Sequence, residues 1–291
     1  MHLVITDSGL GGLGICAAIE RNLRQAGCGP VRMTYVNAWP EEGRGYNSIP
    51  DEAARIAIFD RALSYMGRLQ PDRIVIACNT LSVLYGATAF ARATAIPVVG
   101  IIDAGISLFD EALRANSASR IVLFGTVITI QSGVHRARLI ESGIDAGRIE
   151  AIPCHGLATA IERDADSEAV AAMIDECVSR VSLAGGVTAP VFAGLCCTHY
   201  GYVADRFHAA MESRLDAPVG VLDPNHRLVS LVAPGAPATR TAQGSEDITV
   251  AVVSKVRLSD DTRRGVGRLV AATSSPTAYA LQTYTHVPDL F

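Results

Sequence analysis

Two short stretches of the sequence place a thiol beside polar side chains. Cys78-Asn79-Thr80 follows the apolar run "RIVIA", and Cys197-Thr198-His199 follows "VFAGLC". Such runs are typical of buried parallel strands, and ligands bind at the carboxyl ends of these strands. A thiol beside donors that can hold a carboxylate, ahead of a predicted helix N-terminus, favours acid–base chemistry on a carboxylate-bearing substrate. The sequence therefore predicts a site for a small anion with thiols as the reactive groups.

A pair of thiols suits one reaction in particular. Racemisation removes a proton from one face of a carbon while a second group delivers a proton to the other face, and both groups must be poised near neutral pH. Cys78 and Cys197 would supply these groups. Cysteines without polar neighbours are expected to fill core space, which is the usual place of a buried thiol. Cys154, which His155 follows, stays open between the two roles.

A third stretch, "TDSGLGGLG" at residues 6–14, has the G-x-G-x-x-G spacing of a dinucleotide-binding loop. It opens with Asp7, however, and a carboxylate there takes the place of a cofactor pyrophosphate, because both need the same backbone N–H groups. The next predicted strand also ends at Asn37 instead of at an acid that would hold the ribose. We therefore expect this loop to serve a substrate carboxylate, with a nicotinamide-dependent oxidoreductase as the alternative.

Composition bounds the remaining choices. The 291 residues are 49% hydrophobic and 19% charged, with a formal net charge of −4. The scattered basic residues give no electrostatic footprint for nucleic acid or an anionic membrane. No stretch resembles a membrane span or a signal peptide, so a cytoplasmic location is expected. Seven irregularly spaced cysteines favour free thiols over a disulfide framework or a zinc site, so no metal is expected.

The pattern of the whole chain predicts an α/β fold. Short apolar runs alternate with longer amphipathic stretches, which is typical of strand–helix units around mostly parallel sheets. The expected strands are 3–6, 32–36, 73–77, 98–101, 120–124, 148–152, 191–195 and 219–222, and the expected helices lie near 10–26, 51–68, 80–93, 104–115, 129–142, 166–183 and 200–214. The long loop over 37–50 is expected to cover a site. After a linker over 234–245, "DITVAVVSKVRL" predicts one more strand before a final helical stretch.

Four motifs, "ITDSGLGGL", "VIACNT", "GTVITIQSG" and "CCTHY", resemble in order and spacing the glutamate racemase family of the aspartate/glutamate racemase superfamily. The resemblance runs from about residue 3 to about residue 225. It implies two similar α/β domains, each with a mostly parallel sheet flanked by helices, and an active site in the cleft between them. The first domain is expected to comprise residues 1–98 and 213–234, the second residues 99–212, and residues 235–291 a C-terminal extension packed on the first domain.

The resemblance also implies a cofactor-independent, two-base racemase that interconverts L- and D-glutamate, a precursor of peptidoglycan. The family often forms dimers, so a homodimer is an expected assembly. Cys78 and Cys197 would be the bases. Asp7 would assist Cys78. His199 and Glu162 would support Cys197. Substrate-binding roles are implied for Ser8, Asn79, Thr80 and Thr198.

One loop departs from the family pattern. Where the family has Pro-Tyr-Gly to hold the side-chain carboxylate of the substrate, this sequence has Gly45-Tyr46-Asn47. Tyr46 and the nearby cation Arg44 are therefore the candidates for that role. The substrate stays open between glutamate, aspartate, a hydantoin and another carbon acid. A non-catalytic carboxylate binder that keeps the fold is the alternative from a different class.

Overall fold

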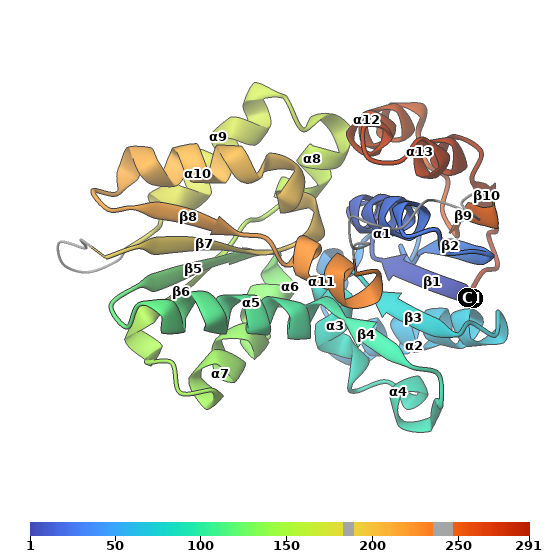
Figure 1. The fold of residues 1–291 in the computed structure, drawn as a ribbon, viewed down its shortest axis with the longest axis horizontal. Coiled ribbons are helices and arrows are strands. Elements are labelled where there is room, and N and C mark those ends of the chain that lie inside the picture. Colours follow the sequence, from blue (N-terminus) through green and yellow to red (C-terminus); the bar gives the residue numbers. More distant parts are fainter. Residues whose placement is uncertain (183–188, 235–246) are drawn as a thin grey trace. The chain divides into compact units, whose positions relative to one another are not determined.

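The protein forms two compact units in a computed structural model that describes residues 1–182, 189–234 and 247–291. Unit 1 comprises Met1–Ile101 and Leu228–Phe291, and unit 2 comprises Ile102–Arg227. Each unit has its own sheet with helices on both faces (Figure 1). The α/β class predicted from the alternation of apolar runs and amphipathic stretches is confirmed.

Unit 1 is built on a six-stranded sheet of order β10-β9-β2-β1-β3-β4, in which every described pair is parallel. Its strands are β1 (His2–Asp7), β2 (Val31–Asn37), β3 (Arg73–Ile76), β4 (Val98–Gly100), β9 (Ile248–Ser254) and β10 (Thr285–His286). Its helices are α1 (Leu13–Gln25), the 3-10 helix η1 (Tyr46–Ser48), α2 (Glu52–Arg68), α3 (Asn79–Tyr85), α4 (Ala89–Ala93), α12 (Asp260–Ala271) and α13 (Ser275–Gln282). All of β1 is buried, as expected for a central parallel strand covered on both faces.

Unit 2 is built on a four-stranded parallel sheet of order β6-β5-β7-β8. Its strands are β5 (Arg120–Gly125), β6 (Ile149–Pro153), β7 (Val191–Cys196) and β8 (Val219–Leu222). Its helical segments are α5 (Ile101–Ala115), α6 (Val127–Gln131), α7 (Val134–Glu141), η2 (Ala146–Arg148), α8 (Leu157–Asp164), α9 (Glu168–Ser179), η3 (Thr198–Val203) and α10 (Ala204–Arg214). A last helix, α11 (Pro224–Val232), runs across the boundary between the units.

The strand order reverses once beside a central strand of each sheet. In unit 1 the chain crosses from β1 to β2 and then back past β1 to β3, and in unit 2 it crosses from β5 to β6 and back past β5 to β7. Because these crossovers are right-handed, the connecting helices cover opposite faces, as α1, α12 and α13 do against α2, α3 and α4 in Figure 1. Ligands bind beyond the carboxyl ends of strands at such a reversal. Cys78 follows β3 and Cys197 follows β7, so each thiol lies at one of these points.

The boundaries of the units differ from those expected. Residues 213–227 belong to unit 2 instead of to the first domain, because β8 pairs with β7 from Val191↔Val219 to Gly194↔Leu222. The C-terminal extension does more than pack on unit 1. Its strand β9 pairs with β2 along the whole of β2, so it completes the sheet. The linker expected over 234–245 lies, apart from Pro234, outside the described residues.

Predicted helices are interrupted where a glycine follows a helix end. The stretch expected as one helix over 80–93 divides into α3 and α4, with Gly86 ending the first and the Thr88 hydroxyl accepting the N–H of Ala91 to cap the second. The stretch over 129–142 divides at Gly133, whose φ of +66° ends α6 and starts α7. Neither α8 nor α11 was expected from the sequence.

Candidate active site

Cys78 lies between β3 and α3, and its side chain is only 5% exposed. The Oγ atom of Ser8 is 3.1 Å from Cys78 Sγ, and the backbone N–H groups of Ser8 and Leu81 also donate to the sulfur. Burial, and then the charge of Asp7, raise the pKa of the Cys78 thiol, and the hydrogen bonds only partly oppose this rise. Cys78 therefore keeps its proton at neutral pH in unit 1, and a positive charge brought beside it would favour the thiolate.

Asp7 ends β1 and is buried beside the glycine-rich loop. Its Oδ1 accepts the N–H of Gly9 at 3.2 Å, so the carboxylate takes one of the donors that a pyrophosphate would need. A Cβ atom on Gly12 would lie 2.9 Å from Ala77 Cβ and 3.0 Å from both Cβ and Oδ2 of Asp7. The φ of Gly12 is −67°, which any residue adopts. Gly12 is therefore required for close packing and not for an unusual backbone conformation.

The first turn of α3 and the 37–50 loop bring further polar groups to Cys78. Asn79 and Thr80 are buried as the first two residues of α3. Tyr46, in η1, is also buried. Burial, and then the charge of Cys78, raise the pKa of its phenol, so this hydroxyl lies within electrostatic range of the thiol.

Arg44 lies in the same loop but in a different environment. Its Nη1 is 3.2 Å from Glu41 Oε1, and the two side chains are 50% and 56% exposed. The ring of Trp39 packs on Gly45, where a Cβ atom would lie 2.7 Å from Trp39 Cη2. This contact fixes the backbone at Gly45, between the exposed Arg44 and the buried Tyr46.

Cys197 follows β7 and precedes η3 in unit 2. Its Sγ is 3.6 Å from Nδ1 of His199, and Nε2 of His199 is 2.7 Å from Oε1 of Glu162 on α8. The three side chains form a chain from thiol to imidazole to carboxylate. The structure thus brings together the three residues that the sequence resemblance assigned to this side of the site.

The protonation state of His199 follows from these contacts. Burial by itself lowers the pKa of the imidazole, but hydrogen bonds with Cys197 and Glu162, together with their charges, outweigh it and hold the pKa well above its ordinary value. His199 is therefore an imidazolium at neutral pH, and both ring nitrogens donate. A cation at this position can hold an incoming anion.

Groups that were not expected from the sequence hold the segment after Cys197. The Nδ2 of Asn225 donates to the carbonyl oxygen of Thr198 at 3.0 Å. A Cβ atom on Gly201 would lie 2.6 Å from Asn225 Nδ2 and 2.6 Å from Asp223 Oδ2, so η3 passes tightly against this turn. The Tyr200 hydroxyl donates to the Cys154 carbonyl oxygen at 3.3 Å. The sequence predicts the strand over 219–222 that precedes Asp223 and Asn225. It does not predict that these two residues contact η3, because residue types in a turn do not show which segment they pack against.

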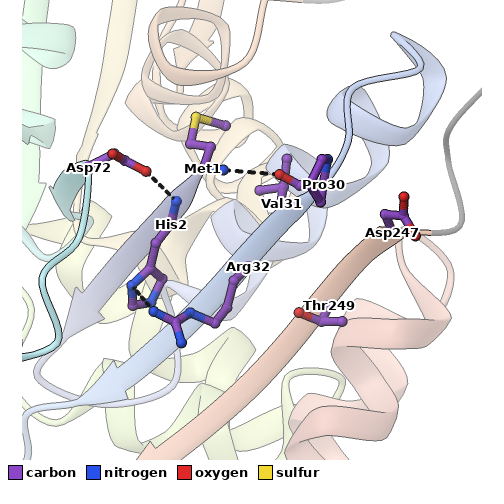
Figure 2. Close-up of a pocket in the computed structure, with 8 residues that line it drawn as sticks. All are labelled: Met1, His2, Pro30, Val31, Arg32, Asp72, Asp247 and Thr249. Carbon is purple, nitrogen blue, oxygen red and sulfur yellow. Dashed lines mark hydrogen bonds between the residues drawn. The ribbon is translucent and has the colours of Figure 1, made fainter.

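A recess of about 560 Å³ lies at the opposite, amino edge of the unit 1 sheet (Figure 2). Three hydrogen bonds join residues of its lining. The N–H of His2 donates to Asp72 Oδ2 at 2.6 Å, the Met1 ammonium donates to the Pro30 carbonyl oxygen at 3.0 Å, and Arg32 Nη2 donates to His2 Nδ1 at 2.8 Å. Because the reactive thiols follow the carboxyl ends of strands, this recess is not the candidate active site.

Across residues 1–182, 189–234 and 247–291, no group of three or more His, Cys, Asp or Glu side chains is placed to hold a metal ion. In the same described ranges, no helix has the length and apolar character needed to cross a membrane.

Comparisons with known proteins place this chain in a family. The profile of the Asp/Glu/Hydantoin racemase family matches residues 10–232. The glutamate racemase of Granulibacter bethesdensis is 28% identical over 223 residues, which are 77% of this chain and 74% of that protein. The glutamate racemase of Aquifex pyrophilus is 30% identical over 145 residues, about half of each chain (50% and 52%).

Solved structures share the fold. Glutamate racemase from Campylobacter jejuni superposes with a TM-score of 0.65 at 18% identity, covering 94% of this chain and 97% of that one. Glutamate racemase from Francisella tularensis, in complex with D-glutamate, superposes with a TM-score of 0.67 at 18% identity, covering 92% of each chain. With a family profile that spans most of its length and both thiol motifs in place, this chain belongs to the Asp/Glu/Hydantoin racemase family.

Proposed function

We propose that this protein is a cofactor-independent amino-acid racemase that interconverts L- and D-glutamate, with Cys78 and Cys197 as its bases. One observation carries the proposal: each thiol follows a strand at a reversal of strand order. Each sulfur also lies beside a group that can exchange a proton with it, the Ser8 hydroxyl at Cys78 and the His199 imidazole at Cys197. The names of the relatives support glutamate as the substrate, since glutamate racemases recur among them. The cytoplasm is the expected location and a homodimer an expected assembly.

The proposed chemistry needs one proton to leave and another to arrive. One sulfur, as thiolate, takes the α-proton from one face of the substrate and becomes a thiol, leaving a planar carbanion. The other sulfur, as thiol, gives its proton to the opposite face and becomes a thiolate. The substrate has then inverted, and the sulfur atoms have exchanged protonation states. The reverse reaction uses the same steps in the opposite order.

The two sides differ in how they would prepare their sulfur. On the Cys197 side, Glu162 stabilises the imidazolium of His199, whose Nδ1 lies 3.6 Å from the sulfur and is the candidate for proton exchange with it. On the Cys78 side, burial and Asp7 favour the thiol. The ammonium group of the substrate would add the positive charge that lowers the pKa of Cys78, with Asp7 as the acceptor of its proton. Substrate binding would therefore activate this sulfur.

Substrate recognition is proposed for the polar groups around the sulfurs. Hydroxyl and amide donors suit the α-carboxylate, and the candidates are Ser8, Asn79, Thr80 and Thr198. The buried phenol of Tyr46 is the candidate for binding the distal carboxylate. Arg44 would join it only by exchanging its exposed partner Glu41 for the substrate.

Isotope exchange tests the function directly. Purified protein, without added cofactor, is incubated in D₂O with L-glutamate or D-glutamate, and we expect each enantiomer to yield its mirror image with deuterium at the α-carbon. Because the delivering sulfur carries a solvent deuteron, product is labelled before the remaining substrate. Cys78→Ala and Cys197→Ala should each abolish racemisation.

The same assay separates the alternatives. Exchange with aspartate or a hydantoin, and not with glutamate, would replace the substrate but keep the two-base chemistry. Thermal stabilisation by glutamate with no proton exchange on any of these carbon acids would instead show a carboxylate-binding protein, and the racemase proposal would be wrong.

A further inference from the structure

The C-terminal segment over 247–291 reaches the carboxyl edge of the unit 1 sheet, where Asp7 and Cys78 lie. Its strand β9 lies beside β2 (Figure 1) and ends at Ser254, which pairs in register with Asn37, the last residue of β2. On the other side of β2, Asn37 pairs in register with Asp7 of β1. Because neighbouring strands are about 5 Å apart, these three residues form one row across three strand ends.

A buried chain of hydrogen bonds joins this row to the start of the 37–50 loop. The Ser254 hydroxyl donates to the Val256 carbonyl oxygen at 2.7 Å and accepts the Nδ2 hydrogen of Asn37 at 3.0 Å. Because a hydroxyl has one proton and the Val256 carbonyl accepts it, Asn37 must turn its NH₂ group towards Ser254. The Oδ1 of Asn37 is then free to accept the N–H of Trp39 at 3.1 Å. Ser254 therefore fixes the orientation of the amide from which the loop begins.

The loop that begins there leads to the phenol of Tyr46. The ring of Trp39 packs on Gly45, which immediately precedes η1 and Tyr46. The hydroxyl of Tyr46 is buried and has no hydrogen-bond partner among the described residues. A buried hydroxyl without a partner costs free energy, and a ligand that supplies an acceptor removes this cost. The conformation of the loop thus decides where this donor lies.

A second contact from the C-terminal segment holds the middle of the loop. The backbone N–H of Arg257 donates to Oε1 of Glu42 at 2.6 Å. Glu42 lies in a tight turn, in which the N–H of Arg44 donates to the Glu41 carbonyl oxygen at 3.1 Å. Arg257 comes three residues after Ser254 in the chain, so the turn that follows β9 contacts the loop both at its start and in its middle.

From these contacts we propose that the turn over 254–257 positions the substrate-binding loop, with Asn37, Ser254 and Glu42 as positioning residues. The inference rests on the proposed function, in which Tyr46 binds the distal carboxylate of glutamate. Loss of either contact lets the loop shift and weakens substrate binding, while the sulfur atoms keep their own partners. KM for glutamate should therefore rise with little change in kcat, as expected when substrate and transition state lose the same binding energy.

Fluorescence tests the position of the loop without reference to activity. Trp39 is the one tryptophan of the chain, so its emission reports on the loop. We expect Ser254→Ala and Glu42→Ala to shift this emission to longer wavelength and to increase its quenching by acrylamide. Ser274→Ala is the matched control, because it removes another buried hydroxyl of the C-terminal segment, which donates to Glu20 Oε2 at 2.8 Å. It should lower stability but leave the Trp39 emission unchanged.

Kinetics with L- and D-glutamate test the consequence for the substrate. Ser254→Ala and Glu42→Ala should each raise KM about fivefold to tenfold, the scale of one lost hydrogen bond. Glu42→Gln keeps an acceptor for the Arg257 N–H and should keep the wild-type KM. Ser274→Ala should also keep it. A role in stability alone would not separate these variants.

The outcomes distinguish this proposal from the proposed function. A wild-type protein that exchanges no α-proton would overturn the racemase. In an active enzyme, unchanged Trp39 emission in Ser254→Ala and Glu42→Ala would overturn the positioning role, and so would altered emission with an unchanged KM. An equal rise of KM in Ser274→Ala would reduce the effect to general stability. Because Glu42 is exposed, its variants decide the question even where Ser254→Ala fails to fold.

Discussion

The Nε2 atom of His199 lies 2.7 Å from Oε1 of Glu162, although 37 residues separate them in the chain. The two side chains are only 8% and 17% exposed, so little solvent screens their interaction. Together with the Cys197 contact, this pair keeps the imidazole charged against the effect of burial. The charge of the imidazole on the Cys197 side therefore depends on a carboxylate that α8 supplies.

Replacing Glu162 by Gln should lower the pKa of His199, since the carboxylate charge is one of the causes of its rise. We expect kcat for glutamate to fall by about 100-fold, the usual scale for a disturbed acid–base group. NMR titration of the His199 imidazole measures the pKa shift. Glu212→Gln, which removes the carboxylate from the exposed His208 pair, is the matched control and should leave kcat unchanged. An unaltered His199 titration would contradict the assignment.

The same pair predicts a pH dependence of stability. Because the folded pKa of His199 is raised above its ordinary value of about 6.5, its contribution is complete below that pH and is lost as the pH rises through the folded pKa. In Glu162→Gln this loss should move to lower pH. Urea unfolding at a series of pH values measures it, and identical curves for the two proteins would speak against the pair.

Gly12→Ala should destabilise unit 1, because the new Cβ would lie 2.9 Å from Ala77 Cβ and 3.0 Å from Asp7 Cβ. The expected loss in unfolding free energy is about 1–3 kcal/mol. Gly86→Ala is the control: no atom lies within 4 Å of its added Cβ, and its φ of −60° suits alanine, so it should be neutral or stabilising. Chemical denaturation compares the two, and equal stability would show that the loop can move.

His135 should make the protein sensitive to acid. Burial, and then the charge of Arg138, lower its pKa from 6.5 to about 4. As the pH falls below 6.5, His135 binds a proton in the unfolded chain but stays neutral in the folded protein. The free energy of unfolding therefore drops by about 3 kcal/mol towards pH 4. His135→Gln should flatten this drop in urea unfolding. His226→Gln, at a site that is 88% exposed, should leave the drop in place.

Asn225→Ala should disturb the segment that carries Thr198 and His199, because it removes the donor to the Thr198 carbonyl oxygen. We expect kcat to fall by about tenfold, with a changed pH profile, since small misplacements of reacting groups are costly. Asn22→Ala removes an equivalent bond, from Nδ2 to the Ala233 carbonyl oxygen at 3.0 Å, on unit 1. It should lower stability without moving the pH profile. Equal kinetics in the two variants would reduce Asn225 to a structural residue.

Local patterns predicted much of the fold. The strand over 219–222 was placed at its observed bounds because a short apolar run between turn residues has few other outcomes. The predicted assignment of this strand to the first domain was wrong. Its pairing with β7 joins residues far apart in the sequence, and the apolar run itself does not specify its partner. Likewise, the sequence predicts β9 as a strand, but only the folded structure shows that it pairs with β2.

The amino-acid sequence by itself determined the chemistry of this protein. The sequence directly gives the thiols, the acid of the glycine-rich loop and the polar residues after each strand. Because they follow apolar runs, they are predicted to lie at the carboxyl ends of strands. Only the tertiary structure decided which groups tune them. The contacts of Glu162 with His199 and of Asn225 with Thr198 join separate elements. Hydrogen bonds and pKa values depend on distance and burial, which local spacing does not specify.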